Sequence, residues 1–352
     1  MGLGAAIAVN GAVDAELGGA TSIEVSERMG ETTTYTIRYD VDISEGDLPL
    51  LTDSRLDVNS ELAVLVPVGD EMVCLAKGPV HAHQIHLEHG GAGSWLDVKG
   101  SDSTVVMDRE SKSAVWADVA DSDAVTSIVG GYGYTPDIQR TAAGHHETKH
   151  TLVQRDSDLR FVRRLARRNG SLFWVTSDAT MVETAHFSRP PLDGSAEAEL
   201  VINLDSPNVL TADINWESER PTSIEGIQLD LNTKQNIDMA VGRTPQRILG
   251  SQGLEDITGD TRSVALSAPV DDAGDLVSRG EGALIESDWF IRVTCETNLA
   301  GVGRPVRAHT VVELKGAGSR HSGKYFVAGV KHTIDAVDHR MSLELVRNGW
   351  NG

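Results

Sequence analysis

Residues 154–176 constrain the fold most strongly, because their pattern specifies a short helix that leads directly into a strand. Asp156 is placed to cap the helix by accepting backbone N–H bonds, and Asp158 in the first turn complements the positive helix end. Apolar residues recur at helical spacing on one face, namely Leu159, Phe161, Val162, Leu165 and Ala166. Asn169-Gly170 supplies a left-handed residue that ends the helix. Strand-forming residues follow at 171–176, so the segment predicts a helix followed by a strand.

Strand patterns dominate most of the remaining sequence. Residues 21–25 and 32–43 predict a hairpin, and its second strand alternates apolar and polar residues as a half-buried strand does. Further strands are predicted at 6–10, 62–68, 72–76, 80–87 and 96–98, with turns at 69–70 and at Lys77-Gly-Pro79. The 35 glycines suit short strands and tight turns. We therefore expect a mainly β fold of the α+β class.

An α/β insert is expected to interrupt these strands. Asp121-Ser-Asp123 predicts the start of a helix that ends at Gly130-Gly131, and the arginine-rich helix follows it. The polar stretch 232–262 predicts a long loop or arm, and a helix is predicted at 271–287. The expected domains are a first β-barrel at 1–101 completed by about 181–231, the insert at 102–180, the arm and helix at 232–288, and a second β-barrel at 289–352.

A weak internal repeat links the two ends of the chain. Each copy gives a strand, a turn, a longer strand, a turn and a strand. The first copy comprises Leu62-Ala-Val-Leu-Val66, Gly78-Pro-Val80 and Trp95-Leu-Asp-Val98. The second comprises Val311-Val-Glu-Leu314, Gly323-Lys-Tyr-Phe-Val327 and Ser342-Leu-Glu-Leu-Val346. The repeat predicts two similar small β-barrels in one chain.

Composition argues against several classes of partner. The net charge of −21 opposes generic binding to nucleic acid or to an anionic membrane surface. No apolar run reaches the ~20 residues that a membrane-spanning helix needs. The start of the chain has no Lys or Arg before its apolar residues, so we expect no signal peptide and assembly in the cytoplasm. Cys74 and Cys295 lie far apart in strand-like segments, which predicts buried, reduced thiols.

Several segments, in the right order along the chain, resemble the hub proteins of contractile tails. These are the phage late-control D proteins, the phage baseplate hubs and the related half of VgrG. The resemblance begins with the helix–strand segment 154–174. It extends to Lys77-Gly-Pro-Val80, residues 97–102, Ser122-Asp-Ala-Val-Thr-Ser-Ile128, Tyr132-Gly133, Gly303-Arg-Pro-Val306, residues 311–316, residues 323–332 and Leu345-Val-Arg-Asn-Gly349.

The resemblance implies a structural protein and not an enzyme, with no cofactor. It implies a homotrimeric hub whose two tube-like β-barrels per chain match the hexameric tail tube, while three-fold symmetry matches a trimeric spike. VgrG proteins continue into a further barrel and a β-helical spike, whereas this sequence ends at residue 352, so a separate spike protein is expected. The other implied partners are the tail tube protein, baseplate wedge proteins and a tape-measure protein or cargo, within a phage virion or contractile injection particle.

The main alternative is a zinc-dependent hydrolase. His146, Glu147 and His150 satisfy the H-E-x-x-H pattern, in which two histidines on one helical face bind zinc and the glutamate activates water. However, Gly144 precedes the motif, a strand pattern follows it, and no acidic third ligand stands out downstream. A polar approach to a strand is the simpler interpretation. A secreted β-rich adhesin is a third hypothesis, weakened by the missing export signal.

Two other motifs have structural interpretations. Residues 318–324 nearly spell a phosphate-binding loop, but Tyr325 stands where Ser or Thr is required and a strand pattern follows instead of a helix. A hairpin turn is therefore predicted there. Four histidines, His81, His83, His86 and His89, could offer ligands to a metal. They have no acidic or cysteine partner at a diagnostic spacing, so ordinary barrel positions are predicted.

Five arginines on the predicted helix are the candidate subunit-interface residues: Arg160, Arg163, Arg164, Arg167 and Arg168. Such a cluster is unusual in so acidic a chain. A solvated helix face with local ion pairs is one explanation. The other is a contact with a neighbouring subunit or baseplate protein, in which guanidinium groups pair with carboxylates.

Overall fold

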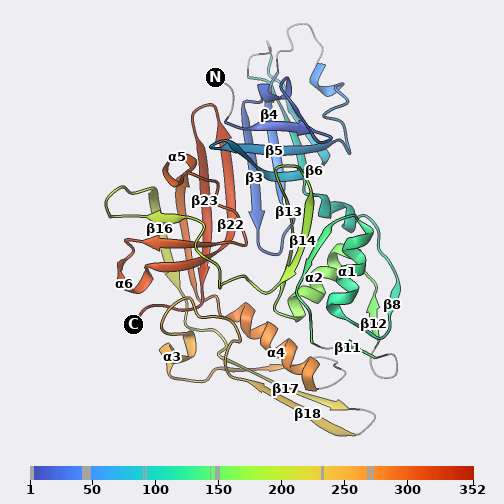
Figure 1. Ribbon diagram of the computed structural model, residues 1–352, viewed down its shortest axis with the longest axis vertical. Helices are drawn as coiled ribbons and strands as arrows, with labels where there is room; N and C mark the ends of the chain where they lie inside the picture. Colours follow the sequence, from blue (N-terminus) through green and yellow to red (C-terminus); the bar gives the residue numbers. More distant parts are fainter. Residues whose placement is uncertain are drawn as a thin grey trace.

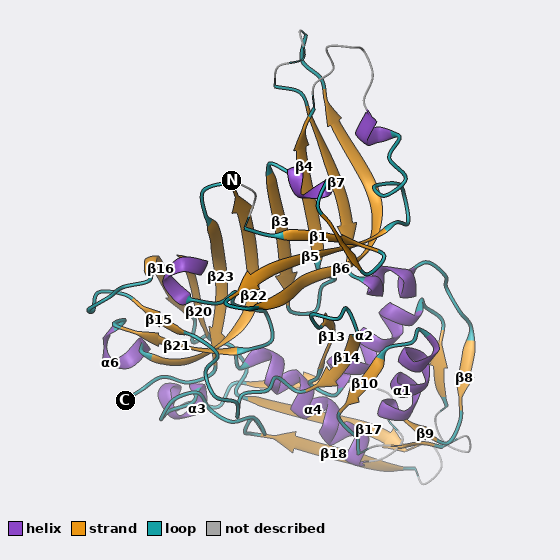
Figure 2. Ribbon diagram, turned by 45° about the horizontal axis from the view of Figure 1, so that its top comes forward, coloured by secondary structure: helices purple, strands orange, loops and turns teal. Residues whose placement is uncertain are grey.

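The computed structural model describes residues 4–41, 49–89, 91, 93–142, 144–146, 151–230, 234–267, 270 and 273–352. Strands predominate, which confirms the mainly β prediction. Two groups of strands lie side by side, a small α/β unit flanks the first group, and a hairpin with a helix lies across the far end (Figure 1). Figure 2 shows the long strands of both groups running through the centre, with most of the helix in the flanking parts.

The N-terminal strand group contains β1 Ala6–Val9, β2 Ala12–Asp14, β3 Ser22–Arg28, β4 Thr34–Asp40, β5 Glu61–Val68, β6 Glu71–His86 and β7 Trp95–Ser101. The C-terminal group contains β15 Glu199–Val201, β16 Val209–Trp216, β20 Ile291–Asn298, β21 Val311–Lys315, β22 Gly323–Asp335 and β23 His339–Arg347. Short helices lie in their connections: η1 Leu17–Gly19, η2 Pro49–Leu51, α5 Leu299–Val302 and α6 Gly318–His321. All of these strands belong to one 13-stranded sheet.

The two groups repeat the same strand order. The N-terminal group runs β3-β4-β7-β6-β5-β1, and the C-terminal group runs β16-β20-β23-β22 and continues through β21 to β15. Neighbours are antiparallel throughout, except that β15 is parallel to β21 whereas β1 is antiparallel to β5. The internal repeat predicted from the sequence therefore corresponds to a repeat of sheet topology.

Local backbone features also recur at equivalent positions. A β-bulge interrupts the β6·β7 ladder between Val80 and Ala82, and another interrupts the β22·β23 ladder between Val327 and Gly329. Val80 exchanges backbone hydrogen bonds with the loop before β5, as Val327 does with the loop before β21. That loop contains a left-handed residue in each half, Asn59 with φ 71° and His309 with φ 65°. Aligning the bulges therefore equates the two halves residue by residue.

The halves are joined by a direct ladder between β22 and β3. This antiparallel pairing runs from Gly329 opposite Arg28 to Asp335 opposite Ser22. Each half nevertheless has its own apolar core, one centred on β3–β7 and one on β20–β23. Among the described strands, no pairing closes either half on itself, and β16 is left as an edge strand.

The turn predicted at Lys77-Gly-Pro79 is wrong, because β6 continues through it. The first part of β6 pairs with β5 as far as Pro79, and the part from Val80 onward pairs with β7. Gly-Pro therefore marks the point where one bent strand passes from one partner to another. A Cβ on Gly78 would lie 2.1 Å from the carbonyl oxygen of Ser101, so glycine is required by this close approach.

The α/β unit has a separate apolar core. Its elements are η3 Ser103–Asp108, β8 Ala114–Trp116, β9 Val119–Ala120, α1 Asp121–Gly131, β10 Thr135–Ile138, β11 Gly144–His145, β12 Leu152–Gln154, α2 Asp158–Arg168, β13 Leu172–Ser177 and β14 Glu183–Ser188. The core extends from Met107 to Phe187 and includes the buried faces of both helices. Both helices occur where the sequence predicts them.

The stretch 232–262 is not simply a loop. Residues 234–262 include β18 Gln235–Val241, which forms a hairpin with β17 Ser223–Asp230, and α3 Leu254–Thr258. With β19 Ser263–Leu266 they form a three-stranded sheet that packs against α4 Ala273–Ser287 (Figure 1). The sequence predicts a loop here because one face of this sheet is exposed, and β18 therefore carries many polar residues.

Both cysteines are buried free thiols, as predicted. Burial raises the pKa of Cys74 to about 11 and that of Cys295 to about 12, so neither thiol is activated. In the described part of the chain, no helix combines the length and apolar character needed to cross a membrane.

Candidate functional site

Helix α2, which carries the candidate interface residues, is held in place by its N-cap, by hydrogen bonds to Asp158 and by its buried apolar face. Its N-cap is Ser157, whose side chain accepts from the backbone N–H of Arg160, so the prediction that Asp156 caps the helix is wrong by one residue. Buried Asp158 accepts hydrogen bonds from Lys112, Tyr132 and Gln154. The apolar face predicted from the sequence is buried in the α/β core. Gly170, with φ 64°, ends the helix as expected.

All five arginines of α2 contact groups of the same chain, drawn from several elements. Arg160 lies 3.2 Å from Asp108, and Arg164 pairs with Asp156. Arg167 forms a two-pronged ion pair with Glu286 of α4, at 2.9 and 3.0 Å. Arg168 pairs with Asp121 at the start of α1. Arg163 donates to Thr32 at 2.8 Å, between β3 and β4. Helix α2 therefore connects the α/β unit to the N-terminal half and to α4.

The five side chains differ in exposure, and this difference separates their roles. Arg160 and Arg167 are more than 70% exposed and Arg164 is about half exposed, so these three can reach another protein. Arg168 is 16% exposed and serves the contact between the two helices. Arg163 is partly buried, and burial lowers its pKa. Candidate contacts with a partner are therefore concentrated on Arg160, Arg164 and Arg167.

A cavity of about 340 Å³ lies beside α2. Its lining includes Met29, Arg163, Phe173, Ile285, Trp289 and Arg292. The Nε atom of Arg163 is buried there without a hydrogen-bond partner among the described residues. The walls come from β3–β4, α2, β13 and α4, so the cavity lies where these parts of the chain meet.

The candidate catalytic and metal motifs do not form a described site. Glu147 and His150 lie outside the described residues, and His146 is exposed, 3.6 Å from Asp118. His81 contacts Ser101, His83 contacts the Leu56 carbonyl, and no cluster of three or more metal-binding side chains occurs among the described residues. Residues 318–324 form α6 and the start of β22, which confirms the hairpin connection predicted there.

A buried polar cluster between the two halves was missed by the sequence patterns. Arg307 donates to Glu27 of β3 at 2.7 Å and to the carbonyls of Cys74 and Leu75 at 2.6 and 3.0 Å. Those carbonyls lie at the β-bulge of β6, which turns them away from the ladder. Burial alone would raise the pKa of Glu27, but Arg307 and His332 outweigh it and the pKa is lowered. The sequence does carry one sign of this cluster. Glu27 follows Ile23 and Val25 at alternate positions of β3, which places a charged side chain on the buried face of the strand.

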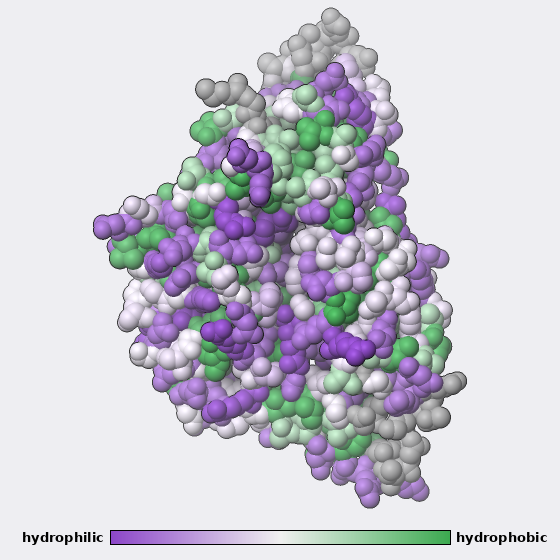
Figure 3. Space-filling view, viewed as in Figure 1, coloured by the Kyte–Doolittle hydropathy of each residue, from purple (hydrophilic) through white to green (hydrophobic). Residues whose placement is uncertain are grey.

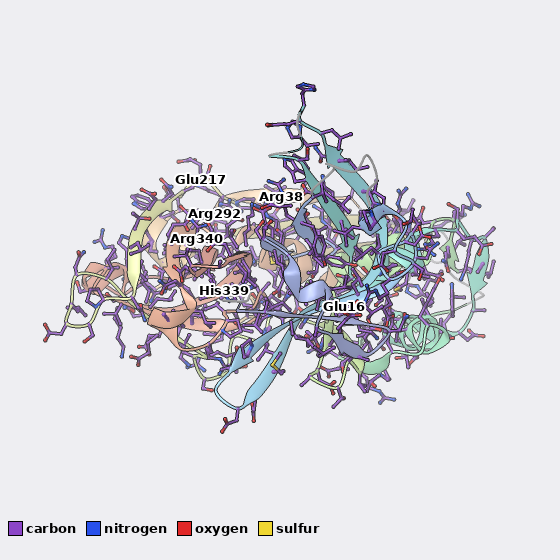
Figure 4. All side chains as sticks on the ribbon, turned by 90° about the horizontal axis from the view of Figure 1, so that it is seen from above. Glu16, Arg38, Glu217, Arg292, His339 and Arg340 are labelled. Atoms are coloured by element: carbon purple, nitrogen blue, oxygen red, sulfur yellow. The ribbon has the colours of Figure 1, made fainter. Side chains whose placement is uncertain are left out.

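Two histidines extend this cluster. His332 of β22 lies 3.5 Å from Glu27 and shares a 2.9 Å hydrogen bond with His339 of β23. Nearby, His309 stacks on Trp174 with ring centroids 4.4 Å apart, which joins the α/β unit to the C-terminal half. In Figure 4, His339 and Arg340 lie together, and Arg38 marks the N-terminal half.

These histidines predict a loss of stability in mild acid. Burial lowers the pKa of His309 and of His339 to about 4, whereas a histidine in an unfolded chain titrates near 6.5. Between these two pH values the unfolded chain binds a proton that the folded chain does not. The free energy of unfolding therefore decreases as the pH is lowered, by about 1.4 kcal/mol per pH unit for each histidine. Burial raises the pKa of Asp288 to about 6, and its contribution has the opposite sign.

Denaturant unfolding at pH 7, 6 and 5 measures this slope. The variant His339→Gln keeps a hydrogen-bonding group beside His332 but cannot titrate, so its stability should fall less steeply. An identical slope in the variant would contradict the assignment.

The family model described as the Alg8 N-terminal domain matches residues 3–220, which is more than half of the chain. The chain belongs to this family. No curated protein sequence matches this chain.

Solved structures share the fold along the full length of the chain. The 43 kDa tail protein of prophage MuSo2 from Shewanella oneidensis has a TM-score of 0.67 at 13% identity, covering 98% of each chain. A tail protein from Neisseria meningitidis has a TM-score of 0.68 at 12% identity, covering 99% of this chain and 98% of that one. An E. coli component of the type VI secretion system, described as similar to T4 tail proteins, has a TM-score of 0.59 at 12% identity, covering 97% and 76%. The chain therefore has the fold of phage tail and secretion-system tail proteins, which confirms the predicted resemblance at the level of fold.

Proposed function

We propose that this protein is a structural baseplate hub of a contractile tail or injection system. The observation that carries the proposal is the repeated strand order, with β3-β4-β7-β6-β5-β1 in one half and β16-β20-β23-β22-β21-β15 in the other. Two similar units in one chain give six units in a trimer. Such a ring presents quasi-six-fold symmetry to a hexameric tail tube and keeps true three-fold symmetry for a trimeric spike.

The proposed partners follow from this role. They are two further copies of the chain, the tail tube protein, a spike protein, baseplate wedge proteins and a tape-measure protein or cargo. The proposed place of action is a phage virion or injection particle assembled in the cytoplasm. We also propose a first barrel domain at 1–101, an insert at 102–180, an arm and helix at 232–288, and a second barrel domain at 289–352. The sequence predicts that about 181–231 completes the first barrel, but β15 pairs with β21 and β16 with β20, so residues 199–216 belong with the second barrel instead. The separate apolar cores support this division.

Light scattering of the purified chain, alone and with its tube and spike proteins, tests the hub. A trimeric mass and a complex with both proteins are expected. A single-chain mass in every mixture would overturn the proposal. Metal content measured on the same sample tests the hydrolase alternative at His146, Glu147 and His150, because that chemistry requires stoichiometric zinc.

The exposed arginines of α2 are the second proposed contact, with a neighbouring subunit or a wedge protein. Reversing the charge of Arg160, Arg164 and Arg167 together should weaken binding to that protein at least tenfold, because rim charges govern encounter and alignment. The loss should be greatest at low salt. The readout is trimer mass and particle assembly, with circular dichroism to confirm folding. Arg163 and Arg168 are left intact because they are the less exposed of the five and hold α2 against Thr32 and Asp121. Unchanged mass and normal particles would contradict the contact.

A further inference from the structure

Two strand segments have a free outer side. Among the strands that the structure describes, β16 pairs only with β20, so its other side is an edge. In β6, the segment from Val80 to His86 pairs with β7 on one side, while β5 reaches only as far as Pro79 on the other. Both segments expose apolar side chains: Ile85 is 42% exposed and Trp216 51%, and Leu87, just after β6, is 56% exposed. Figure 3 shows apolar surface at the rim where β16 lies in Figure 1.

These two segments are the counterparts of the two strands that join the halves. Aligning the β-bulges equates Val80 with Val327 and therefore β6 with β22. Following the ladders outward equates β4 with β20 and β3 with β16. Within the chain, β22 pairs with β3. Their counterparts, β6 for β22 and β16 for β3, do not pair with each other within the chain. Among the described strands, each is unpaired on the side that corresponds to the β22·β3 ladder.

We propose that β6 of one copy pairs antiparallel with β16 of the next, in the register that β22 and β3 adopt within the chain. This inference rests on the trimeric hub and names the surface that closes it. The transferred register places His83 opposite Trp216, Ile85 opposite Ile214 and His86 opposite Asp213. The sheet then continues without interruption around the ring.

Burial inside the chain supports this register. Val330, His332 and Ile334 face the β22·β3 junction from β22 and are at most 2% exposed. Of their counterparts, His83 is partly buried against the Leu56 carbonyl, whereas Ile85 and Leu87 are exposed in a single chain. Pairing with β16 would remove Ile85 and Leu87 from water, together with Trp216 on the opposite strand. Burying these apolar side chains favours association.

Charge supports it independently. Within the chain, Arg28 of β3 reaches across Gly329 to Glu344 of β23, at 2.7 Å. The counterparts of these three residues are Glu217, Ala82 and Lys99. The signs are reversed, the pair remains complementary, and the residue between them remains small. In the single chain, Glu217 is 64% exposed and lies 3.4 Å from Arg220, and Lys99 donates to Gln84 in an exposed hydrogen bond. A partner can therefore reach both side chains. Figure 4 labels Glu217 on the C-terminal half.

Disulfide cross-linking of the full chain tests the register. His86→Cys with Asp213→Cys places two thiols on directly opposed residues, whose Cα atoms are about 4.5–5.5 Å apart in an antiparallel pair and so within disulfide range. The matched control is His86→Cys with Glu217→Cys, which is four residues, or about 13 Å, out of register. The native thiols are buried, so they do not compete.

Mild oxidation at a concentration where light scattering gives the trimer mass should link most chains of the first variant into covalent trimers. The control should give less than a tenth of that yield. A trimeric mass with no preference for position 213 would overturn the strand pairing and leave the hub intact. Cross-linked ladders beyond three copies would support the pairing but overturn the closed ring. A chain that stays single at its highest soluble concentration, without cross-links, would overturn both.

Discussion

Replacing Arg307 with alanine is expected to lower the free energy of unfolding by about 3–5 kcal/mol, because it leaves a buried carboxylate without its counter-charge. The Glu27 side chain is 6% exposed, and Arg307 also satisfies two backbone carbonyls of β6. One substitution therefore removes an ion pair and two hydrogen bonds between the halves. Denaturant unfolding at pH 7, followed by tryptophan fluorescence, measures the change.

The chain contains a matched control for this prediction. Arg28 and Glu344 also link β3 to the C-terminal half, but both side chains are about half exposed. Arg28→Ala should therefore cost less than about 1 kcal/mol. Equal losses for Arg307→Ala and Arg28→Ala would show that burial of the Glu27 pair is not what stabilises the junction.

Gly78→Ala should destabilise the protein by about 3 kcal/mol or more, a large effect for the addition of one methyl group. The new Cβ would lie 2.1 Å from the Ser101 carbonyl oxygen and 2.7 Å from the Asp102 carbonyl carbon. These are backbone atoms, so β6 and β7 would have to separate. The Tyr35 hydroxyl, which donates to the Gly78 carbonyl at 2.9 Å, would lose its partner as well. The denaturation midpoint and the yield of soluble protein measure the loss.

Gly130→Ala serves as the comparison, because a Cβ at this position in α1 would meet nothing within 4 Å. Alanine should stabilise the helix by about 0.5–1 kcal/mol. If Gly78→Ala proved as harmless as Gly130→Ala, the close passage of β6 past Ser101 would not exist in solution.

Local patterns were sufficient to predict most elements. Helix α2 follows from apolar spacing and from Gly170, and β3 and β4 follow from alternation. The N-cap was missed by one residue because Asp156 and Ser157 are both good caps, and tertiary contacts select between them. Gly-Pro in β6 was assigned to a turn because the same dipeptide serves a turn or a bend in a long strand.

Pairings distant in sequence could not be predicted. The β22·β3 ladder joins residues about 300 positions apart, and neither strand pattern specifies its partner. The arginines of α2 were recognisable as a cluster, but their separation into exposed and internal side chains depends on Thr32, Asp121 and Glu286 from three other elements. The β18 strand was missed because its exposed face carries polar residues.

The ladder between β22 and β3 has a consequence for any attempt to divide the molecule. Cutting the chain into its halves would leave each fragment with a long strand whose N–H and C=O groups point into water. Bare strands of this kind recruit other chains, which leads to aggregation or domain swapping. The repeat in the fold therefore does not divide the chain into two independent domains. Each half needs the other to cover one of its strand edges.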